Sequence, residues 1–396
     1  MKRTSSRRLA PTRRVVDRVA DRVMYRVANR VADRVMYRYV VPGLAALALL
    51  LCGRAAAQEQ TLTLVSWGGA YARACEKGYV ERFERETGID IQIEDYNGGL
   101  AQIRAQVDVG NVYWDVVDME LPDMVRGCDE GLLVPIDVDD LAPGADGSPA
   151  ADDLHEDAIT ECGPTNLYYS TVVVYNDARI GAAKPSSIAD FFDLEKFPGR
   201  RGMRRSPLVN LEFALMADGV PPDEVYATLD TEAGVGRAFR KLDAIKDRIV
   251  WWEAGAQPPQ MLADGEVVMT TAYNGRIFNA QVLESQPFVI VWDGQVLDTG
   301  GLVIVEGTRN LEAAKAFVRF ANTARAMADV GRYISYSPTR RSAINLISTH
   351  AETGVEMSPH MPTSPENVRR ALHNDWEWWS DNGEEMNERF STWLAR

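Results

Sequence analysis

Few side chains in this chain of 396 residues are of a type and spacing that could carry chemistry. The four histidines (His155, His350, His360 and His373) lack the close spacing of metal ligands, so no metal site is expected. Tyr168 and Tyr169 could ligate ferric ion, but strand tyrosines that pack between layers explain the pair better. The phosphate-loop, dinucleotide, zinc-protease, dithiol and serine-hydrolase motifs are all missing. This pattern favours a binding protein without a cofactor, and a secreted enzyme or a ferric-ion carrier is the distant alternative.

Three cysteines follow the first segment of the chain: Cys75, Cys128 and Cys162. In an oxidising compartment, an odd number of cysteines predicts one disulfide and one free thiol. Spacing does not determine the connectivity. Of the three pairings we take Cys128–Cys162 as the working prediction.

Residues 1–57 differ from the rest of the chain in charge. They hold 13 basic and 3 acidic residues, whereas residues 58–396 hold 30 and 54, a net charge of −24. The uncharged run 39–52 and the following small residues have the layout of a secretory signal peptide, cleaved near Ala57. The position of the translation start is left undetermined, because residues 17–26 and 29–38 nearly repeat each other and Met36 is a second possible start. We therefore expect a periplasmic protein, and its acidic body disfavours nucleic-acid binding.

The elements that must position a site alternate between strand-like and helix-like segments. The first three strands are predicted at 61–66, 89–93 and 114–119, and the helices between and after them at 71–87, 100–109 and 122–130. This alternation predicts a parallel sheet with helices on both faces. After a polar loop at 137–157 a second run begins. Its strands are predicted at 167–175, 202–205, 249–252, 267–273, 288–292 and 302–305, and its helices at 188–194, 208–218, 235–247, 311–328 and 366–394.

Several short motifs in a fixed order carry a family resemblance. They are Trp67-Gly68-Gly69 after the first strand, Phe83–Asp90, Trp114–Val117, Gly131–Asp137, Leu262–Val267 and Tyr273–Arg276. Each motif is weak alone, but their order over residues 60–345 resembles the periplasmic solute-binding proteins of ABC importers, specifically the spermidine/putrescine-binding group.

The resemblance implies an α/β fold of the two-lobed periplasmic-binding-protein type (type II). Each lobe would be a mixed, mainly parallel sheet flanked by helices, and crossing strands would form the hinge. Lobe I would comprise residues 58–166 and 279–335, and lobe II residues 167–278 and 336–396. The implied partners are a small-molecule ligand and a membrane permease, and the implied state is a monomer without enzyme activity.

The family's interlobe cleft can be projected onto this sequence, because open α/β sheets bind ligands at the carboxyl ends of their strands. The candidate ligand-binding residues are Trp67, Gly68, Gly69, Tyr71, Asn97, Glu120, Arg204, Arg205, Trp252, Glu253, Tyr273, Asn274, Arg276 and Asp298.

The charges of these candidates depart from a polyamine site, which needs carboxylates for ammonium groups and aromatic rings for methylenes. Arg204 and Arg205 stand where that group places acids, and a buried Arg276 should meet an anion. We therefore expect a small zwitterion such as γ-aminobutyrate, clamped between Arg276 and Asp298 and stacked on Trp67. The alternative is a polyamine, with Arg276 pointing away from the cleft. The arginines could also pair with acids across the lobe interface, and Glu120 and Glu253 could be solvated rim residues.

Overall fold

The computed structural model describes residues 61–396 and, before them, Met24 alone. Residues 61–396 form one compact unit. The predicted signal peptide lies outside the described residues and stays a prediction. No helix in the described part is both long and apolar enough to cross a membrane.

Eleven strands form the sheet of the described unit, in the order β2-β1-β3-β9-β5-β8-β6-β7. The short strands β4 and β10 pair with β5, and β11 pairs with β9. The strands are β1 Thr61–Ser66, β2 Asp90–Asp95, β3 Val116–Glu120, β4 Ile159–Thr160, β5 Gly163–Asn176, β6 Arg201–Arg204, β7 Ile249–Trp252, β8 Met269–Tyr273, β9 Phe288–Ile304, β10 Ser337–Pro338 and β11 Leu372–His373.

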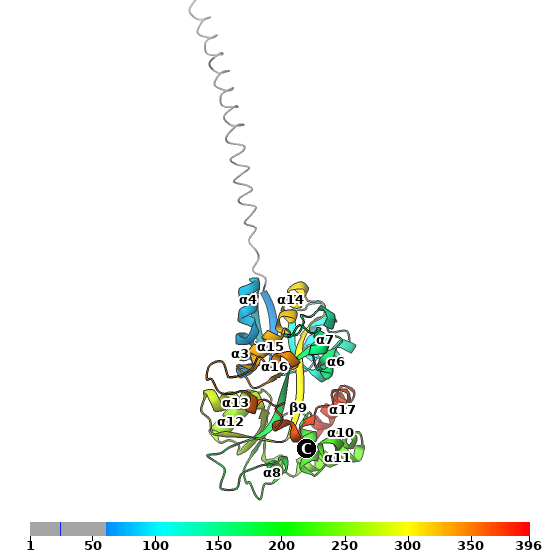
Figure 1. Ribbon diagram of the computed structural model, residues 1–396. Coiled ribbons are helices and arrows are strands. Elements are labelled where there is room, and N and C mark those ends of the chain that lie inside the picture. Colours follow the sequence, from blue (N-terminus) through cyan, green and yellow to red (C-terminus); the bar gives the residue numbers. More distant parts are fainter. Residues whose placement is uncertain (1–23, 25–60) are drawn as a thin grey trace, which may run out of the picture. The chain divides into compact units, whose positions relative to one another are not determined.

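Helices flank this sheet (Figure 1). The α-helices are α3 Gly69–Cys75, α4 Glu81–Thr87, α5 Ala101–Asp108, α6 Leu121–Asp129, α7 Ala150–Asp153, α8 Ile188–Phe192, α9 Asn210–Ala217, α10 Val225–Leu229, α11 Glu232–Asp243, α12 Gln257–Asp264, α13 Asn274–Leu283, α14 Leu311–Ala321, α15 Ala324–Gly331, α16 Arg341–Ile344 and α17 Trp376–Leu394. A π-helical segment, η2 Glu76–Val80, joins α3 to α4, and the 3-10 turns are η3 Val138–Asp140, η4 Glu156–Ala158, η5 Pro222–Glu224, η6 Lys246–Arg248, η7 Ser358–His360 and η8 Asn367–Arg370.

The first three strands are parallel, as their alternation with helices predicts, with β1 between β2 and β3. The helix predicted between β1 and β2 is present as the run α3, η2 and α4. It ends at Gly88, which has φ 73° and closes the helix in the left-handed conformation that glycine adopts without strain. This part of the fold follows directly from the local sequence pattern.

Two long antiparallel strands, β5 and β9, cross the middle of the sheet. In Figure 1 the yellow strand β9 runs between the group of helices around α14 and α6 and the group around α12 and α8. Residues 300–304 of β9 pair with β3, whereas residues 171–175 of β5 pair with β8. These two strands are the expected hinge. The predicted lobe boundary after residue 278 falls inside α13, and the division into lobes remains a prediction.

Four predicted elements, two strands and two helices, differ from the structure. The strands expected at 288–292 and 302–305 are one strand, β9, because β5 pairs with its residues 288–291 and 296–301 and β3 pairs with its residues 300–304. The helix expected at 311–328 breaks into α14 and α15, where the Thr323 side chain caps the second helix. The last helix begins at Trp376 and not at residue 366, because β11 pairs with β9 and Asp375 caps α17.

Strand β5 is apolar on both faces because it separates two hydrophobic cores. Val172 and Val174 belong to the core that packs α3, α4, α14 and α15, whereas Val173 and Tyr175 belong to the core that packs α8, α9, α11 and α17. Successive side chains of a strand point to opposite faces, so a strand with a core on each side reads as a continuous apolar run.

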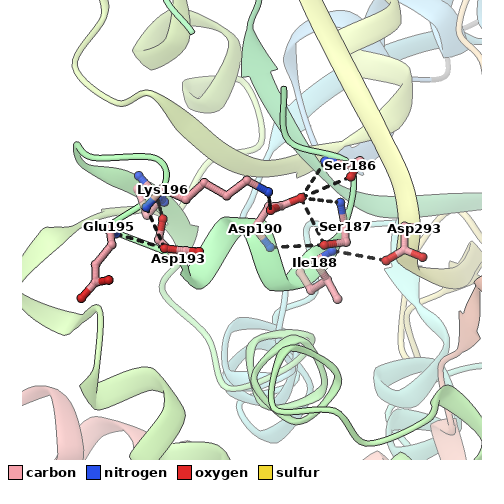
Figure 2. Close-up of polar contacts among 9 residues, drawn as sticks. Ser186, Ser187, Ile188, Asp190, Asp193, Glu195, Lys196 and Asp293 are labelled. Atoms are coloured by element: carbon pink, nitrogen blue, oxygen red, sulfur yellow. Dashed lines mark hydrogen bonds and ion pairs between the residues drawn. The ribbon is translucent and has the colours of Figure 1, made fainter. Parts of the chain in front are cut away.

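Local capping fixes the helix that opens the second run of elements, α8. The Ser187 side chain accepts a hydrogen bond from the Asp190 backbone N–H, and Asp190 in turn accepts from the Ser187 backbone N–H. Figure 2 shows this capping box, with Lys196 bound to the same Asp190 carboxylate at 2.7 Å. These local contacts mark where the helix starts, and the distant Asp293 adds a hydrogen bond from the Ile188 backbone N–H at 3.4 Å.

The cysteines pair as in the working prediction: Cys128 and Cys162 form a disulfide, and Cys75 is free. The disulfide ties α6 to the start of β5, close to the base of the hinge. Cys75 is buried, and burial raises the pKa of its thiol to about 12, so this thiol is unreactive at neutral pH.

Candidate functional site

A small cavity, here called the inner cavity, opens beside the carboxyl ends of β1, β3 and β8. Five aromatic side chains and three ionisable groups face it, together with apolar residues of the hinge strands. Its lining residues are Trp67, Tyr71, Asp118, Met119, Glu120, Leu167, Tyr169, Tyr273, Arg276, Gly300 and Tyr336. The cavity lies where open α/β sheets place their ligands.

The aromatic rings of the inner cavity touch one another and form a nearly continuous wall. The ring of Tyr336 lies 5.6 Å from that of Tyr71 and 5.9 Å from that of Tyr169, between ring centroids. Tyr169 also packs edge-on against Tyr273 at 5.5 Å. Such a wall can cover the methylene groups of a short ligand and exclude water from its charged ends.

Arg276 is the cation of the inner cavity, and only 4% of it is exposed. Its guanidinium donates hydrogen bonds to the backbone carbonyls of Gly68 at 2.9 Å and Trp67 at 2.8 Å. The predicted alternative of an acidic partner is therefore not what the structure shows. A Cβ atom at Gly69 would lie 2.8 Å from Nη1 of Arg276, which explains the glycine there. The contact joins the start of α3 to the start of α13 across the cavity.

Glu120 and Arg204 form an ion pair at the edge of the inner cavity, with Nη1 2.8 Å from Oε1. Glu120 ends β3 and Arg204 ends β6, so the pair connects elements from the two halves of the sheet. The Tyr169 hydroxyl also donates to Oε1 of Glu120, at 3.3 Å. The pairing of Arg204 with an acid is the alternative that the sequence left open.

Asp118 is the second carboxyl group of the inner cavity and is 3% exposed. Its Oδ2 accepts a hydrogen bond from the Tyr71 hydroxyl at 2.5 Å and a longer one from Ser66 at 3.5 Å. Burial raises the pKa of Asp118 to about 7, although these hydrogen bonds and Arg276 oppose the rise. The group is therefore poised to change charge near neutral pH.

A second, larger and more polar cavity, here called the outer cavity, shares Glu120 with the inner one. The sequence-derived candidates Asn97, Arg204, Arg205 and Glu253 line it, beside the start of α6 and one side of α17. Arg205 and Glu253 pair at 3.1 Å with both side chains more than half exposed. The outer cavity adjoins the inner one at Glu120, and Glu253 is a solvated residue of its rim.

Asp298 does not share a cavity with Arg276, contrary to the expected clamp. It lines a third cavity, next to the segment that leads into α17. Its carboxyl group accepts from the Thr299 backbone N–H at 2.8 Å and from the Asn374 side chain at 3.1 Å. Burial raises the pKa of Asp298 to about 8. The alternating side chains of β9 put Asp298 on the same strand face as Gly300, but only Gly300 reaches the inner cavity.

Two further candidates, Trp252 and Asn274, are buried residues that contact the elements carrying the lining residues. Trp252 is 1% exposed and packs its ring against that of Tyr273 at 5.7 Å, so it belongs to the core. Asn274 is fully buried, accepts from the Ser170 backbone N–H at 2.9 Å and donates to the Ser335 carbonyl at 2.6 Å. These contacts fix the start of α13 and hence the position of Arg276.

Sequence reasoning placed Trp67, Tyr71, Glu120, Tyr273 and Arg276 in the site, and all five line the inner cavity. It missed the other lining residues, which are Asp118, Met119, Leu167, Tyr169, Gly300 and Tyr336. One signal was available, because an acid two positions before Glu120 in a strand must share its face.

This geometry defines a class of protein: a two-lobed α/β binding protein whose cavity is lined by aromatic rings and charged groups. The chain belongs to the bacterial extracellular solute-binding protein family, whose pattern matches residues 78–363.

Relatives of known structure or function agree with this assignment. The chain is 41% identical over 360 residues to the γ-aminobutyric acid-binding protein of Pseudomonas aeruginosa, covering 91% of this chain and 98% of that protein. It is similar to the periplasmic binding protein MotA of A. tumefaciens B6 in complex with glucopine (TM-score 0.77, 28% identity, 85% and 100% of the two chains). It is also similar to the Atu4243 GABA receptor (TM-score 0.71, 29% identity, 85% and 98%). The predicted two-lobed fold and solute-binding class are confirmed.

Proposed function

We propose that this protein captures γ-aminobutyrate, or a closely similar amino carboxylate, in the inner cavity and delivers it to the permease of an ABC importer. The observation that carries the proposal is one buried cavity that combines a guanidinium group, two carboxyl groups and an aromatic wall. A zwitterion with a short methylene chain matches each of these features. The relative that is 41% identical is named for the same ligand.

The charges of the cavity suggest how such a ligand lies. Its carboxylate meets the free N–H groups of Arg276, because two of the five guanidinium donors are used by Trp67 and Gly68. Its methylenes pack on the rings of Tyr169 and Tyr273. Its ammonium group then points toward the acidic end of β3.

A polyamine fits the cavity less well. It carries positive charge at each end, and Arg276 lines the inner cavity where the polyamine alternative expects it to point away. Glu120 is already neutralised by Arg204. A second ammonium group would therefore face a buried cation without a carboxylate of its own.

Ligand capture by this fold requires closure of the lobes. Trp67 and Asp118 come from the first part of the chain and Tyr273 and Arg276 from the second, so a bound ligand contacts both. A ligand that binds the closed form better shifts the population toward it. The closed, monomeric protein would then dock on the permease. Export to the periplasm with cleavage near Ala57 is part of the same proposal.

The first experiment is a thermal-shift screen of protein purified from cells that express the full chain. Its ligands are γ-aminobutyrate, β-alanine, glutamate, butyrate, putrescine and spermidine, because a tight ligand raises the Tm by mass action. We expect stabilisation by γ-aminobutyrate and little effect of butyrate or of the polyamines. Stabilisation by putrescine or spermidine alone would contradict the proposed ligand.

A further inference from the structure

The two carboxyl groups of the inner cavity are in different states. Glu120 has a cation of its own, Arg204, at 2.8 Å. Asp118 takes part in no salt bridge within residues 61–396, although it is the more deeply buried of the two. A desolvated carboxylate without a counter-ion is costly, so Asp118 is the group that gains most from a ligand's positive charge.

The hydrogen bonds of Asp118 leave one of its oxygens for a ligand. The hydrogen bonds from Tyr71 and from Ser66 both end on Oδ2, and the Trp67 side chain also donates to this carboxyl group. The Tyr96 hydroxyl holds the same residue by its backbone carbonyl, at 2.5 Å. The side chain is thus fixed on one edge, and Oδ1 is left for an ammonium group in the cavity that Asp118 lines.

Several other groups face Asp118. They are Ser66 and Trp67 at the end of β1, Tyr71, Cys75 and Tyr79 in α3 and η2, Tyr96, Glu120 in the same strand, Tyr336 and Arg276. Burial raises the pKa values of these tyrosines and of Cys75, so they stay neutral at neutral pH. Arg276 is the cation among them and is held by two carbonyl groups.

We propose that Asp118 selects the ligand's amine: its Oδ1 binds the ammonium group, and the Asp118 carboxyl proton leaves to solvent when the amine arrives. Each amine bound at acidic pH therefore releases one proton, and the cavity exchanges a neutral carboxyl group for a carboxylate–ammonium pair. This inference rests on the proposed function. The inference explains why Asp118 can be buried without a cation. In the empty cavity its carboxyl group is protonated and carries no negative charge.

The sign of the pH effect follows from the raised pKa of Asp118, about 7. Below that pH the empty cavity holds the proton, which must leave before the amine binds, so affinity rises with pH. Above it the carboxylate is already formed and affinity becomes constant. Exchange of one proton changes the Kd by about tenfold per pH unit on the acidic side. The amine and the carboxylate of γ-aminobutyrate titrate well outside this range, with pKa values of about 10 and about 4.

Isothermal titration of the exported protein, purified from cells that express the full chain, tests the exchange without any substitution. γ-Aminobutyrate is titrated at three pH values in buffers of different ionisation enthalpy, which gives the number of protons released. We expect about one proton at pH 5.5, about half of one at pH 7 and almost none at pH 8.5. γ-Aminobutyrate binding that is independent of pH and releases no proton overturns this inference and leaves the proposed function standing. Absence of binding by every amino carboxylate overturns both.

Three variants locate the proton. Asp118→Asn keeps the shape of the side chain, cannot ionise, and is expected to lose at least about a hundredfold in affinity and all proton release. Tyr71→Phe removes a hydrogen bond that lowers the Asp118 pKa, so affinity should still depend on pH but level off at a higher pH. Glu212→Gln is the matched control, because burial also raises the pKa of Glu212 to about 7 but this residue lies in the α9–α17 core. The assignment of the released proton to Asp118 is overturned if Asp118→Asn still releases a proton on binding, or if Glu212→Gln no longer does.

Discussion

The inner and outer cavities meet at the ion pair of Glu120 with Arg204, yet they are built from different chemistry. The inner cavity is small, aromatic and buried, and its ionisable side chains are held by hydrogen bonds. The outer cavity is larger and polar, and its pair Arg205–Glu253 is more than half exposed. Charges interact more strongly in a dry site than in water. The comparison therefore predicts that affinity comes from the inner cavity and that the outer one mainly provides access.

Apart from Asp118→Asn, the largest effect on binding is expected from Arg276→Ala. The substitution removes the cavity's cation and both hydrogen bonds to the start of α3, so γ-aminobutyrate binding should weaken by more than about 2 kcal/mol, roughly thirtyfold. Isothermal titration measures the loss, and Arg276→Lys tests whether charge alone suffices. An unchanged affinity would remove Arg276 from the site.

Glu212→Gln should separate stability from binding. Burial raises the pKa of Glu212 to about 7, above its unfolded value of 4.5, so its contribution to stability is fully present below about pH 4.5 and is lost as the pH rises through 7. Gln cannot ionise, and its carbonyl oxygen can still accept from Trp379. The variant should gain stability relative to the wild type between pH 5 and pH 8, on the order of 2 kcal/mol. Denaturant unfolding of both proteins at pH 5 and at pH 8 measures this. The prediction is refuted if the variant and the wild type differ in free energy of unfolding by the same amount at both pH values.

Trp67→Ala should have a smaller effect on binding, of about 1 kcal/mol, because it removes part of the aromatic wall and no charge. The preference for γ-aminobutyrate over putrescine should stay the same. Competition titration with both ligands measures the preference, and a change in the favoured ligand charge would contradict a packing role for Trp67.

The smallest effect is expected from Arg205→Ala in the outer cavity. An exposed ion pair contributes little, so the change in γ-aminobutyrate affinity should stay below about 0.5 kcal/mol. The association rate should fall modestly at low salt, because a cation near the opening attracts the ligand carboxylate. Stopped-flow measurements at two ionic strengths test this. A loss as large as that of Arg276→Ala would abolish the distinction between the two cavities.

The positions of most elements were predictable because their signals are local. Ile89, Ile91 and Ile93 alternate as a half-buried strand requires, and Gly88 ends the preceding helix. The site was predictable where a residue type was unusual for its place, as with Arg276. Tyr169 and Tyr336 were not, because a tyrosine in an apolar segment has the same local pattern whether it faces a core or a cavity.

By itself, the sequence determined the α/β alternation, the family and a cleft that mixes aromatic rings with arginines. Only the tertiary structure decided which charged groups share a cavity. In the tertiary structure Asp118 lines the inner cavity and Arg204 forms an ion pair with Glu120. Asp298 lines the third cavity and accepts a hydrogen bond from Asn374. The physical reason is that these pairings join residues more than 70 positions apart. No local pattern encodes such distances, because they depend on how the two hinge strands bring the halves of the sheet together.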